Sequence, residues 1–536
     1  MKFRLSLEGV YLLLILAMIL FAGPGILFNK SLTHSTPQGF LASDSYWHYS
    51  LAQYVREQGK YDLMPPSMVA GYEDVVGFNP PMLYTTTASL SILSGIEVHD
   101  AIQIMGFLFT LLAIFAMYFI VRRVNRKVAL MALPLTLLVY VSPFNTAFLV
   151  GQWHFLTGVA FIAGAVMVVA SLGIGKGWPL LAIMLMGLVN SHTAEFYYFV
   201  GFLLALFAVR LFLRQLKMGE VKKTALAYAI GIAASFYYGI IFLNTYQKYN
   251  SIELFKVTTS VANFTNIHFS DFSWLQFFLF AGIALNLFFI VRKLISKQPF
   301  GAAYLFPLAM LVVGLSNYFF LDYHAFQVRF MWPIYLAPLF VYPLYQLMAS
   351  FKLKSAVFAY AGSFIIMIVV FFGFAGLNGM QMQISPEYWN QVQWIKQNTA
   401  ENARVLYLPG DLHSGAFVWP QQRVPYIAAV DSYDEFASNG SVKQDYTVYI
   451  SSASDSKYAY RGGLFSYGYH GIEENLTVSR DICDYDYLVI DGASREPIIA
   501  QYNIALAERL FRAGAEQVFA NGKGVVVRNA GGDCLG

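Results

Sequence analysis

The chain has 536 residues, of which 57% are hydrophobic and only 12% are charged, and its net charge is +4. A typical soluble domain carries about twice that charged share, so an ordinary soluble core would not hide this much apolar side chain. The sequence also lacks a Lys/Arg-rich patch with interleaved aromatic residues, which argues against nucleic acid as a partner. The composition predicts a protein that is embedded in a lipid bilayer.

Apolar runs of about twenty residues recur through residues 1–376, and each is long enough to cross the hydrocarbon core as a helix. The first run, Val10 to Phe28, is long and is followed by further runs, so we interpret it as a retained span rather than a signal peptide. We expect an all-α membrane domain of about eleven transmembrane helices. The other spans are predicted near 101–121, 128–148, 155–173, 177–191, 196–213, 224–243, 274–291, 301–320, 330–348 and 355–376.

Lysine and arginine are distributed unevenly between the predicted loops. A cluster from Arg122 to Lys127 follows the second span, and later loops on the same side are richer in these residues than the loops on the other side. Cytoplasmic loops carry such an excess. With an odd number of spans, this predicts a cell-membrane protein with a cytoplasmic N-terminus and an extracytoplasmic C-terminal domain.

The composition changes after the last apolar run, and residues 385–536 are rich in charge, Gly, Asn and Gln. Helices are predicted from Pro386 and over 498–512, with strands at 404–408, 446–450, 485–490 and a pair near 516–528, which indicates a soluble α/β domain. This domain holds both cysteines, Cys483 and Cys534. An extracytoplasmic location favours a disulfide between them, and two unpaired thiols are the alternative.

The first outer loop, residues 29–97, is too long to be a simple connection. Within it, Asp44 and His48 stand one helical turn apart and therefore on one side of a predicted helix. This pairing suits chemistry at the membrane surface. The alternative is that Asp44 caps the helix and His48 merely lies at the water interface.

All nine histidines map to outer loops, outer helix ends or the outer domain, which concentrates the polar chemistry on that side. Exclusion of histidine from apolar spans and short inner loops explain part of this bias. The histidines are His34, His48, His99, His154, His192, His268, His324, His413 and His470.

Two further outer segments carry ionisable residues. His192 and Glu195 lie at the turn between two spans, where such a pair is costly unless it serves a cavity. A helix turn capped by Ser191 or Thr193 is the alternative. Arg329 lies at the outer end of another span, where its guanidinium suits a lipid-linked phosphate, with ordinary snorkelling to the interface as the alternative.

Pro80 and Pro81 then begin an apolar helix at about 82–93, before the second span. This order, an opening span, an outer Asp-x-x-x-His helix, a Pro-Pro-led helix and the next span, resembles the GT-C superfamily of membrane glycosyltransferases. That superfamily includes oligosaccharyltransferase catalytic subunits and transferases that use polyprenyl-phosphate sugars. The segment from Trp389 to Leu406 also resembles the region after the last span in archaeal members, so an archaeal origin is expected.

The resemblance implies transfer of a sugar from a polyprenyl-phosphate-linked donor to a glycan or protein acceptor at the outer face. Asp44 occupies the place of the superfamily's active-site acid, and would act as general base or hold a divalent cation, Mg or Mn, with the acceptor amide. Glu195 is a second candidate metal ligand. Arg329 would stabilise the departing lipid phosphate, and His48, His192 and Glu195 would bind substrate.

The sequence departs from the superfamily at two motifs. The Trp-Trp-Asp-Tyr-Gly motif of oligosaccharyltransferases is absent, and residues 463–468 do not replace it; the next outer loop, 144–154, contains no acidic residue. Transfer of a single sugar is therefore favoured over N-linked oligosaccharyl transfer. A catalytically silent relative, a transporter, and an envelope protein whose outer domain binds a partner or metal are the alternatives.

Overall fold

The structure is a computed structural model, and it describes the following parts of the chain: residues 6–26, 31–40, 43–63, 76–77, 79–141, 147–148, 151–249, 284–285, 287–288, 291–292, 295–296, 302–315, 334–339, 341–342, 345, 361–365, 368, 386–400, 403–408, 441–447, 469–470, 475–492, 497–522 and 524–529.

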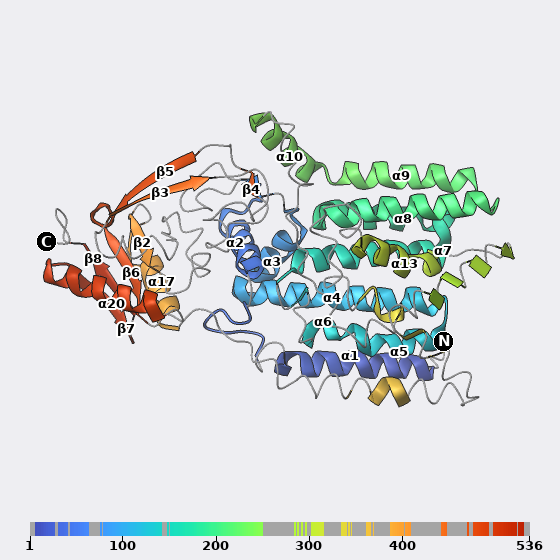
Figure 1. Cartoon of the computed structure of the whole chain (residues 1–536), viewed down its shortest axis with the longest axis horizontal. Coiled ribbons are helices and arrows are strands. Elements are labelled where there is room, and N and C mark those ends of the chain that lie inside the picture. The colour runs from blue at the N-terminus through green and yellow to red at the C-terminus, as the bar shows by residue number, and fades with distance from the viewer. Residues whose placement is uncertain are drawn as a thin grey trace.

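Long apolar helices run side by side in a bundle, and a small sheet domain lies beyond one end of it (Figure 1). The bundle includes α1 (Leu7–Ile26), α4 (Val98–Arg122), α8 (Thr193–Phe212) and α9 (Met218–Ala234). Among the described residues, three helices are long and apolar enough to cross a membrane, and a bent helix pair adds a fourth. This is the architecture of a multi-pass membrane protein with an added α/β domain.

Helix α7 (Trp153–Ser191) is a hairpin of two membrane-length legs. Its 39 residues would extend about 58 Å as one helix, roughly twice the hydrocarbon thickness. Gly173, at φ 67° and ψ 158°, interrupts the helix. A Cβ placed on Gly187 would overlap the ring of Phe161, so the second leg packs closely against the first. The two legs correspond to the predicted spans 155–173 and 177–191.

The span predicted at 224–243 is instead two helices, α9 and α10 (Phe236–Tyr249), which are bent by 66°. Ser235 lies at the break, where its hydroxyl accepts a hydrogen bond from the Asn190 amide at 2.7 Å and donates one to the Gly231 carbonyl at 2.9 Å. A tertiary contact from α7 therefore accompanies the bend, and periodicity along the chain does not reveal it.

The span predicted at 128–148 is likewise divided, into α5 (Arg126–Thr136) and α6 (Leu138–Val141). Pro134 lies inside α5, where it cannot donate a backbone hydrogen bond. Helix α13 (Ala302–Leu315) falls in the predicted span 301–320. Only short pieces of the last predicted spans are described, so the count of about eleven stays a prediction.

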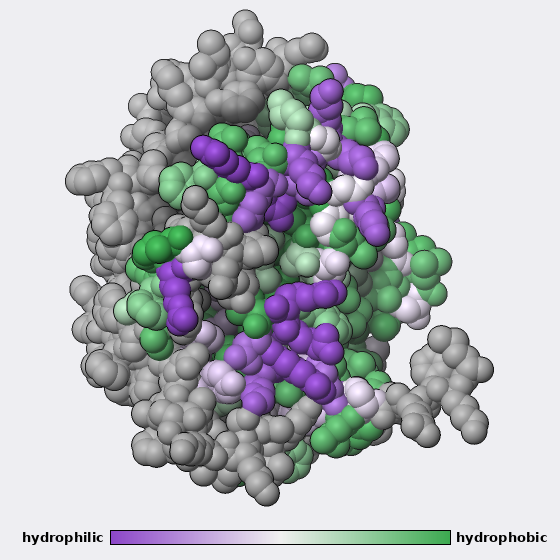
Figure 2. Space-filling view, turned by 90° about the vertical axis from the view of Figure 1, so that its right-hand side faces the viewer, coloured by the Kyte–Doolittle hydropathy of each residue, from purple (hydrophilic) through white to green (hydrophobic). Residues whose placement is uncertain are grey.

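Glu8 joins three helices at the end of the bundle opposite the sheet domain. Its buried carboxylate pairs with Arg126 Nε at 2.6 Å and with Arg122 Nη2 at 3.1 Å, and it accepts a hydrogen bond from the Tyr118 hydroxyl. Hydrophilic side chains gather at this end in Figure 2. The basic cluster and the sheet domain thus lie at opposite ends of the bundle, as the predicted sidedness requires.

The first outer loop forms its own elements at the end that faces the sheet domain. They are α2 (Ser43–Gln58), the two-residue strand β1 (Val76–Gly77) and α3 (Met82–Ser94). Helix α3 begins after Pro81 and ends at Gly95, whose φ of 74° is a left-handed cap. The predicted helix at 82–93 is therefore present.

The α/β domain has three layers around a four-stranded sheet, with strand order β2-β6-β8-β7. Strands β2 and β6 are parallel, and the other neighbours are antiparallel. Alternate residues of β2 face opposite sides: Val405 and Tyr407 share a cluster with one helix, and Leu406 and Leu408 with the other. The helices are α17 (Pro386–Asn398) and α20 (Pro497–Arg512); the strands are β2 (Val405–Leu408), β6 (Tyr487–Asp491), β7 (Glu516–Asn521) and β8 (Gly524–Arg528).

Two short antiparallel pairs lie outside this sheet. Strand β3 (Ser441–Thr447) pairs with β5 (Asn475–Asp481), so it begins earlier than the strand predicted at 446–450. Strand β1 of the outer loop pairs with β4 (Tyr469–His470).

Cys483 lies in the short 3-10 helix η5 (Ile482–Asp484) and is disulfide-bonded. Cys534 lies outside the described residues, so its pairing with Cys483 stays a prediction.

Candidate active site

Three histidines from separate parts of the chain meet at the end of the bundle that faces the sheet domain. His48 comes from α2, His154 from the start of α7, and His192 from the junction of α7 and α8. The ring centroids of His48 and His154 are 4.2 Å apart, and those of His154 and His192 are 4.7 Å apart. We call these residues the histidine array. The hairpin at Gly173 creates it, because the hairpin returns the end of α7 to its beginning.

His48 is fully buried and makes one hydrogen bond. Its Nδ1 is hydrogen-bonded to the Tyr84 hydroxyl of α3 at 2.7 Å, whereas its Nε2 has no partner among the described residues. Burial, with a smaller effect from His192, lowers the pKa of His48 to about 3. The imidazole is therefore neutral near physiological pH and can donate or accept one further hydrogen bond.

His192 and Glu195 form a pair at the other end of the array, in which Glu195 is fully buried and His192 is partly buried. Nδ1 of His192 is hydrogen-bonded to Oε2 of Glu195, and the carboxylate is 0% exposed. A Cβ on Gly158 would lie 2.7 Å from Glu195 Oε2 and 2.9 Å from His192 Cβ. Only glycine at this position lets the first leg of α7 approach the pair so closely.

The structure does not support the alternative in which the Ser191 side chain caps the helix turn. Its hydroxyl donates back to the Leu188 carbonyl at 3.3 Å, and His192, the N-cap residue of α8, makes no side-chain cap hydrogen bond. The Thr193 side chain lies outside the described set. The pair is thus held by buried tertiary contacts with α7.

The structure does not describe the side chains of two predicted site residues, Asp44 and Arg329. Asp44 belongs to α2 by its backbone, one turn before His48, but its side chain is not described. Arg329 lies wholly outside the described residues. Of the predicted site residues, the structure therefore brings together His48, His192 and Glu195.

His154 and Tyr84 were missed as site residues by sequence reasoning. His154 was visible only as one of nine outer histidines, at the start of a predicted span. Its role in linking His48 to His192 follows from the α7 hairpin. Tyr84 carried no signal, because a tyrosine in an apolar helix is common in membrane proteins.

A divalent-cation site needs several carboxylate, histidine or cysteine ligands close together. Within the described part of the chain, no group of three or more His, Cys, Asp or Glu side chains has the geometry to hold a metal ion. Glu195 and the array do not form a metal centre by themselves, and the Asp44 side chain is not described. The divalent-cation requirement therefore stays a prediction.

A separate polar cluster joins the first outer loop to the α/β domain. Asp100 at the start of α4 accepts a backbone hydrogen bond from His34 and pairs with its Nδ1, each at 2.7 Å. The indole of Trp389, on α17, donates to the Ser35 carbonyl at 2.8 Å and packs edge-on against His99. We call these five residues the junction. Two outer histidines thus hold the loop in place rather than join the array.

No family model and no curated protein matches the chain. Solved structures do. ArnT from Cupriavidus metallidurans bound to undecaprenyl phosphate aligns over 97% of this chain and 98% of its own, at 12% identity and a TM-score of 0.52. The oligosaccharyltransferase of Archaeoglobus fulgidus tethered with an acceptor peptide aligns over 94% and 72%, at 12% identity and a TM-score of 0.51.

The chain has the GT-C fold. A third structure is the Archaeoglobus fulgidus oligosaccharyltransferase AglB in complex with an inhibitory peptide and a dolichol-phosphate. It aligns over 78% of this chain at 12% identity and a TM-score of 0.50, and this chain covers 64% of its length. The resemblance predicted from the order of elements is confirmed. Because similar structures come from an archaeon and from Cupriavidus metallidurans, archaeal origin stays a prediction.

Proposed function

We propose that the chain is a membrane glycosyltransferase that moves a single sugar from a polyprenyl-phosphate donor to a glycan or protein acceptor at the outer face. The GT-C fold supports this proposal. Two similar structures hold a bound lipid phosphate, undecaprenyl phosphate in ArnT and dolichol-phosphate in AglB. The observation that carries the proposal is the histidine array with Glu195, in which His48 and Glu195 are fully buried, because ionisable groups in an apolar bundle are costly and mark functional sites.

In this mechanism Asp44 is the general base. It takes the proton of the acceptor hydroxyl while the acceptor oxygen bonds to the anomeric carbon, and the bond from that carbon to the lipid phosphate breaks on the opposite side. The configuration inverts. Asp44 lies one turn before His48 on α2, which directs both residues to one side of the helix.

Arg329 is proposed to stabilise the lipid phosphate as it leaves, because a guanidinium pairs with two phosphate oxygens at once. His48, His192 and Glu195 orient the reacting groups. Two buried aromatic side chains, Tyr84 against His48 and Phe155 against His192, exclude water that would hydrolyse the donor.

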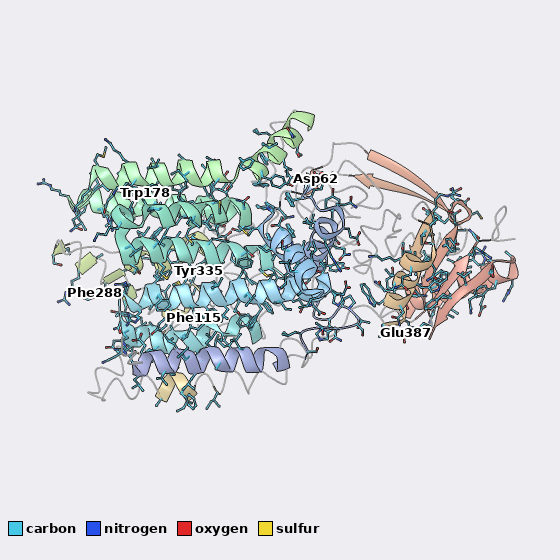
Figure 3. All side chains as sticks on the ribbon, turned by 180° about the vertical axis from the view of Figure 1, so that it is seen from behind. Asp62, Phe115, Trp178, Phe288, Tyr335 and Glu387 are labelled. Carbon is cyan, nitrogen blue, oxygen red and sulfur yellow. The ribbon has the colours of Figure 1, made fainter. Side chains whose placement is uncertain are left out.

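The test uses purified protein in lipid nanodiscs, radiolabelled polyprenyl-phosphate sugars and a membrane extract as acceptor. Asp44→Asn should reduce transfer about 10²- to 10⁴-fold, the usual contribution of a general base. Asp62→Asn is the matched control, since it removes the same charge from the same loop, at the end of the bundle that faces the sheet domain (Figure 3). Undiminished transfer by Asp44→Asn would reject the assignment.

The same preparations separate a transferase from a transporter. A transferase forms a new glycosidic bond, which appears as label in the acceptor fraction and as sugar-free lipid phosphate. A transporter in sealed liposomes moves label across the bilayer and leaves the donor intact. Uptake without any glycosylated product would favour the transporter.

A further inference from the structure

The chain just before α7 lies against the first turn of α2, the helix that carries Asp44. Gly151 lies in this segment, and its φ of 82° is in the left-handed region. A Cβ placed on Gly151 would lie 2.5 Å from the backbone nitrogen of Ser45 and 2.7 Å from its Cα. That nitrogen belongs to the peptide bond that joins Asp44 to Ser45. Gly151 therefore approaches the backbone of Asp44 more closely than any residue with a Cβ could.

This contact falls at the part of α2 that the helix holds least well by itself. Because α2 begins at Ser43, Asp44 and Ser45 belong to its first turn. The N–H groups of a first turn have no acceptor within the helix, and helix ends fray. Ser45 is nevertheless 0% exposed. Packing from other elements therefore fixes the position of the Asp44 backbone.

Two residues at the start of α7 contact the chain on both sides of Asp44. The ring of Trp153 packs edge-on against Phe40, four residues before Asp44, at a centroid distance of 5.9 Å. The ring of His154 lies 4.2 Å from that of His48, four residues after Asp44. One short segment of α7 thus holds the chain before and after the proposed general base.

Trp153 is itself held firmly in the bundle. It is 2% exposed, and its indole N–H donates a hydrogen bond to the Phe148 carbonyl at 3.1 Å. A Cβ on Gly106 of α4 would lie 2.7 Å from the indole ring, so α4 packs closely against it. Residues 144–154 contain no acidic side chain. This loop therefore acts on the site through close packing rather than through a second carboxylate.

We propose that Gly151 and Trp153 are positioning residues that hold Asp44 where it can take the proton of the acceptor. This role rests on the proposed function and adds the residues through which α7 acts on the general base. Neither residue touches the substrate in this role, because its effect passes through the backbone of α2. The effect of changing either one must therefore disappear once the Asp44 carboxylate is removed.

The experiment measures kcat and KM for Gly151→Ala, alone and combined with Asp44→Asn, in the nanodisc transfer assay. The new methyl must displace the first turn of α2. Gly151→Ala should lower kcat about 10²-fold and change KM less than about threefold, because a misplaced catalytic group slows the reaction without weakening binding. The double variant should be within about threefold of Asp44→Asn alone, because a residue that acts through Asp44 has no further effect in its absence.

Gly59→Ala is the matched control at the other end of α2. Gly59 has a φ of 64°, and nothing lies within 4 Å of a Cβ there, so the substitution causes the backbone strain without the contact. Its kcat should stay close to that of wild type. Amide hydrogen exchange at residues 47–50, whose N–H groups bond to carbonyls of the first turn, should rise in Gly151→Ala and stay unchanged in Gly59→Ala.

Trp153→Phe tests the same role without changing the backbone, and it applies even where Gly151→Ala does not fold. The smaller ring loses the hydrogen bond to Phe148 and part of the contact with Phe40. Its kcat should fall about tenfold, and again the loss should disappear in the Asp44→Asn background. Trp178→Phe is the control on the same helix, at the end of the bundle remote from the sheet domain (Figure 3), and should leave kcat unchanged.

Three results would overturn the proposal: Gly151→Ala and Trp153→Phe keep the kcat of wild type, their losses multiply fully with that of Asp44→Asn, or Gly59→Ala loses as much activity as Gly151→Ala. Failure of the proposed function has a different signature. In that case wild type forms no transfer product with any donor, while hydrogen exchange at residues 47–50 still rises in Gly151→Ala and not in Gly59→Ala.

Discussion

Burial, rather than a charged partner, sets the pKa of His48, and the residue therefore makes the stability of the folded chain depend on pH. Its pKa is lowered to about 3 in the folded chain, against an ordinary value of 6.5. Below pH 6.5 the imidazole of the unfolded chain binds a proton that the folded chain does not bind. The free energy of unfolding is therefore unaffected by the titration of His48 above pH 6.5, and it decreases as pH falls from 6.5 toward 3. The slope is about 1.4 kcal/mol per pH unit.

The measurement is the thermal unfolding of wild type and His48→Gln in detergent between pH 7 and pH 5. Glutamine retains a polar group for the Tyr84 hydroxyl but does not titrate, so the variant should lose less stability over this range than wild type. Parallel curves for the two proteins would show that His48 has an ordinary pKa.

Gly158 lies directly against the His192–Glu195 pair, and its replacement should reduce activity more than stability. In Gly158→Ala the new methyl would contact Glu195 and His192, which must then shift by several tenths of an ångström. We expect transfer to fall about tenfold or more, because misplacement on this scale is costly in an active site. Gly201→Ala is the control, since nothing lies within 4 Å of a Cβ there. Equal activity of the two variants would contradict the role of the pair.

Sequence reasoning selected His48, His192 and Glu195 because ionisable residues are rare at membrane depth. It did not find His154 as their partner. This contact depends on how helices pack, because His154 meets His192 only where α7 folds back. Residue type and spacing along the chain do not predict such contacts.

Among the helices, the α7 hairpin is the element on which the site depends. Its legs pack closely where Gly187 faces Phe161, and a methyl group at Gly187 would overlap the ring. Gly187→Ala should lower the free energy of unfolding by about 1–3 kcal/mol, as overpacking does. Thermal unfolding in detergent measures the change, with Gly201→Ala as a matched helix substitution that should not destabilise the chain. Trimming the ring in Gly187→Ala/Phe161→Leu should restore part of the loss.

Apolar length predicted the helices of the membrane domain well, including α3, α4 and both legs of α7. It failed at Ser235, where one predicted span is two helices bent by 66°. The residues on both sides of the bend are apolar, so their hydropathy is that of a continuous span. The hydrogen bond from Asn190 that accompanies the bend comes from another element, and local sequence does not encode it.

At the scale of the whole molecule, the α/β domain is tied to the first outer loop at several points. The junction is one, and the pairing of β1 with β4 is another. Lys396 on α17 also pairs with Glu57 on α2 at 3.1 Å, but this exposed contact contributes little by itself. Because α2 carries Asp44 and His48, the position of the domain bears on the proposed active site. The sequence predicted two domains but gave no indication of these ties.

Trp389 is the residue through which this coupling can be tested. Its indole donates to Ser35 and packs on His99, and it is 6% exposed. Trp389→Ala should loosen residues 31–40 and raise their amide hydrogen exchange about tenfold, which corresponds to about 1.4 kcal/mol of lost local stability. Transfer activity should fall in parallel, because the loop that leads into α2 is no longer held.

Trp394→Ala is the matched control on the same helix, since Trp394 stacks on Phe519 inside the α/β domain. It should raise exchange in β7 and leave residues 31–40 unchanged. If both variants raised exchange only within the α/β domain, Trp389 would be a core residue of that domain and not a link to the outer loop. If Trp389→Ala raised amide hydrogen exchange in residues 31–40 but left transfer activity unchanged, the α/β domain would hold the outer loop without affecting the proposed active site.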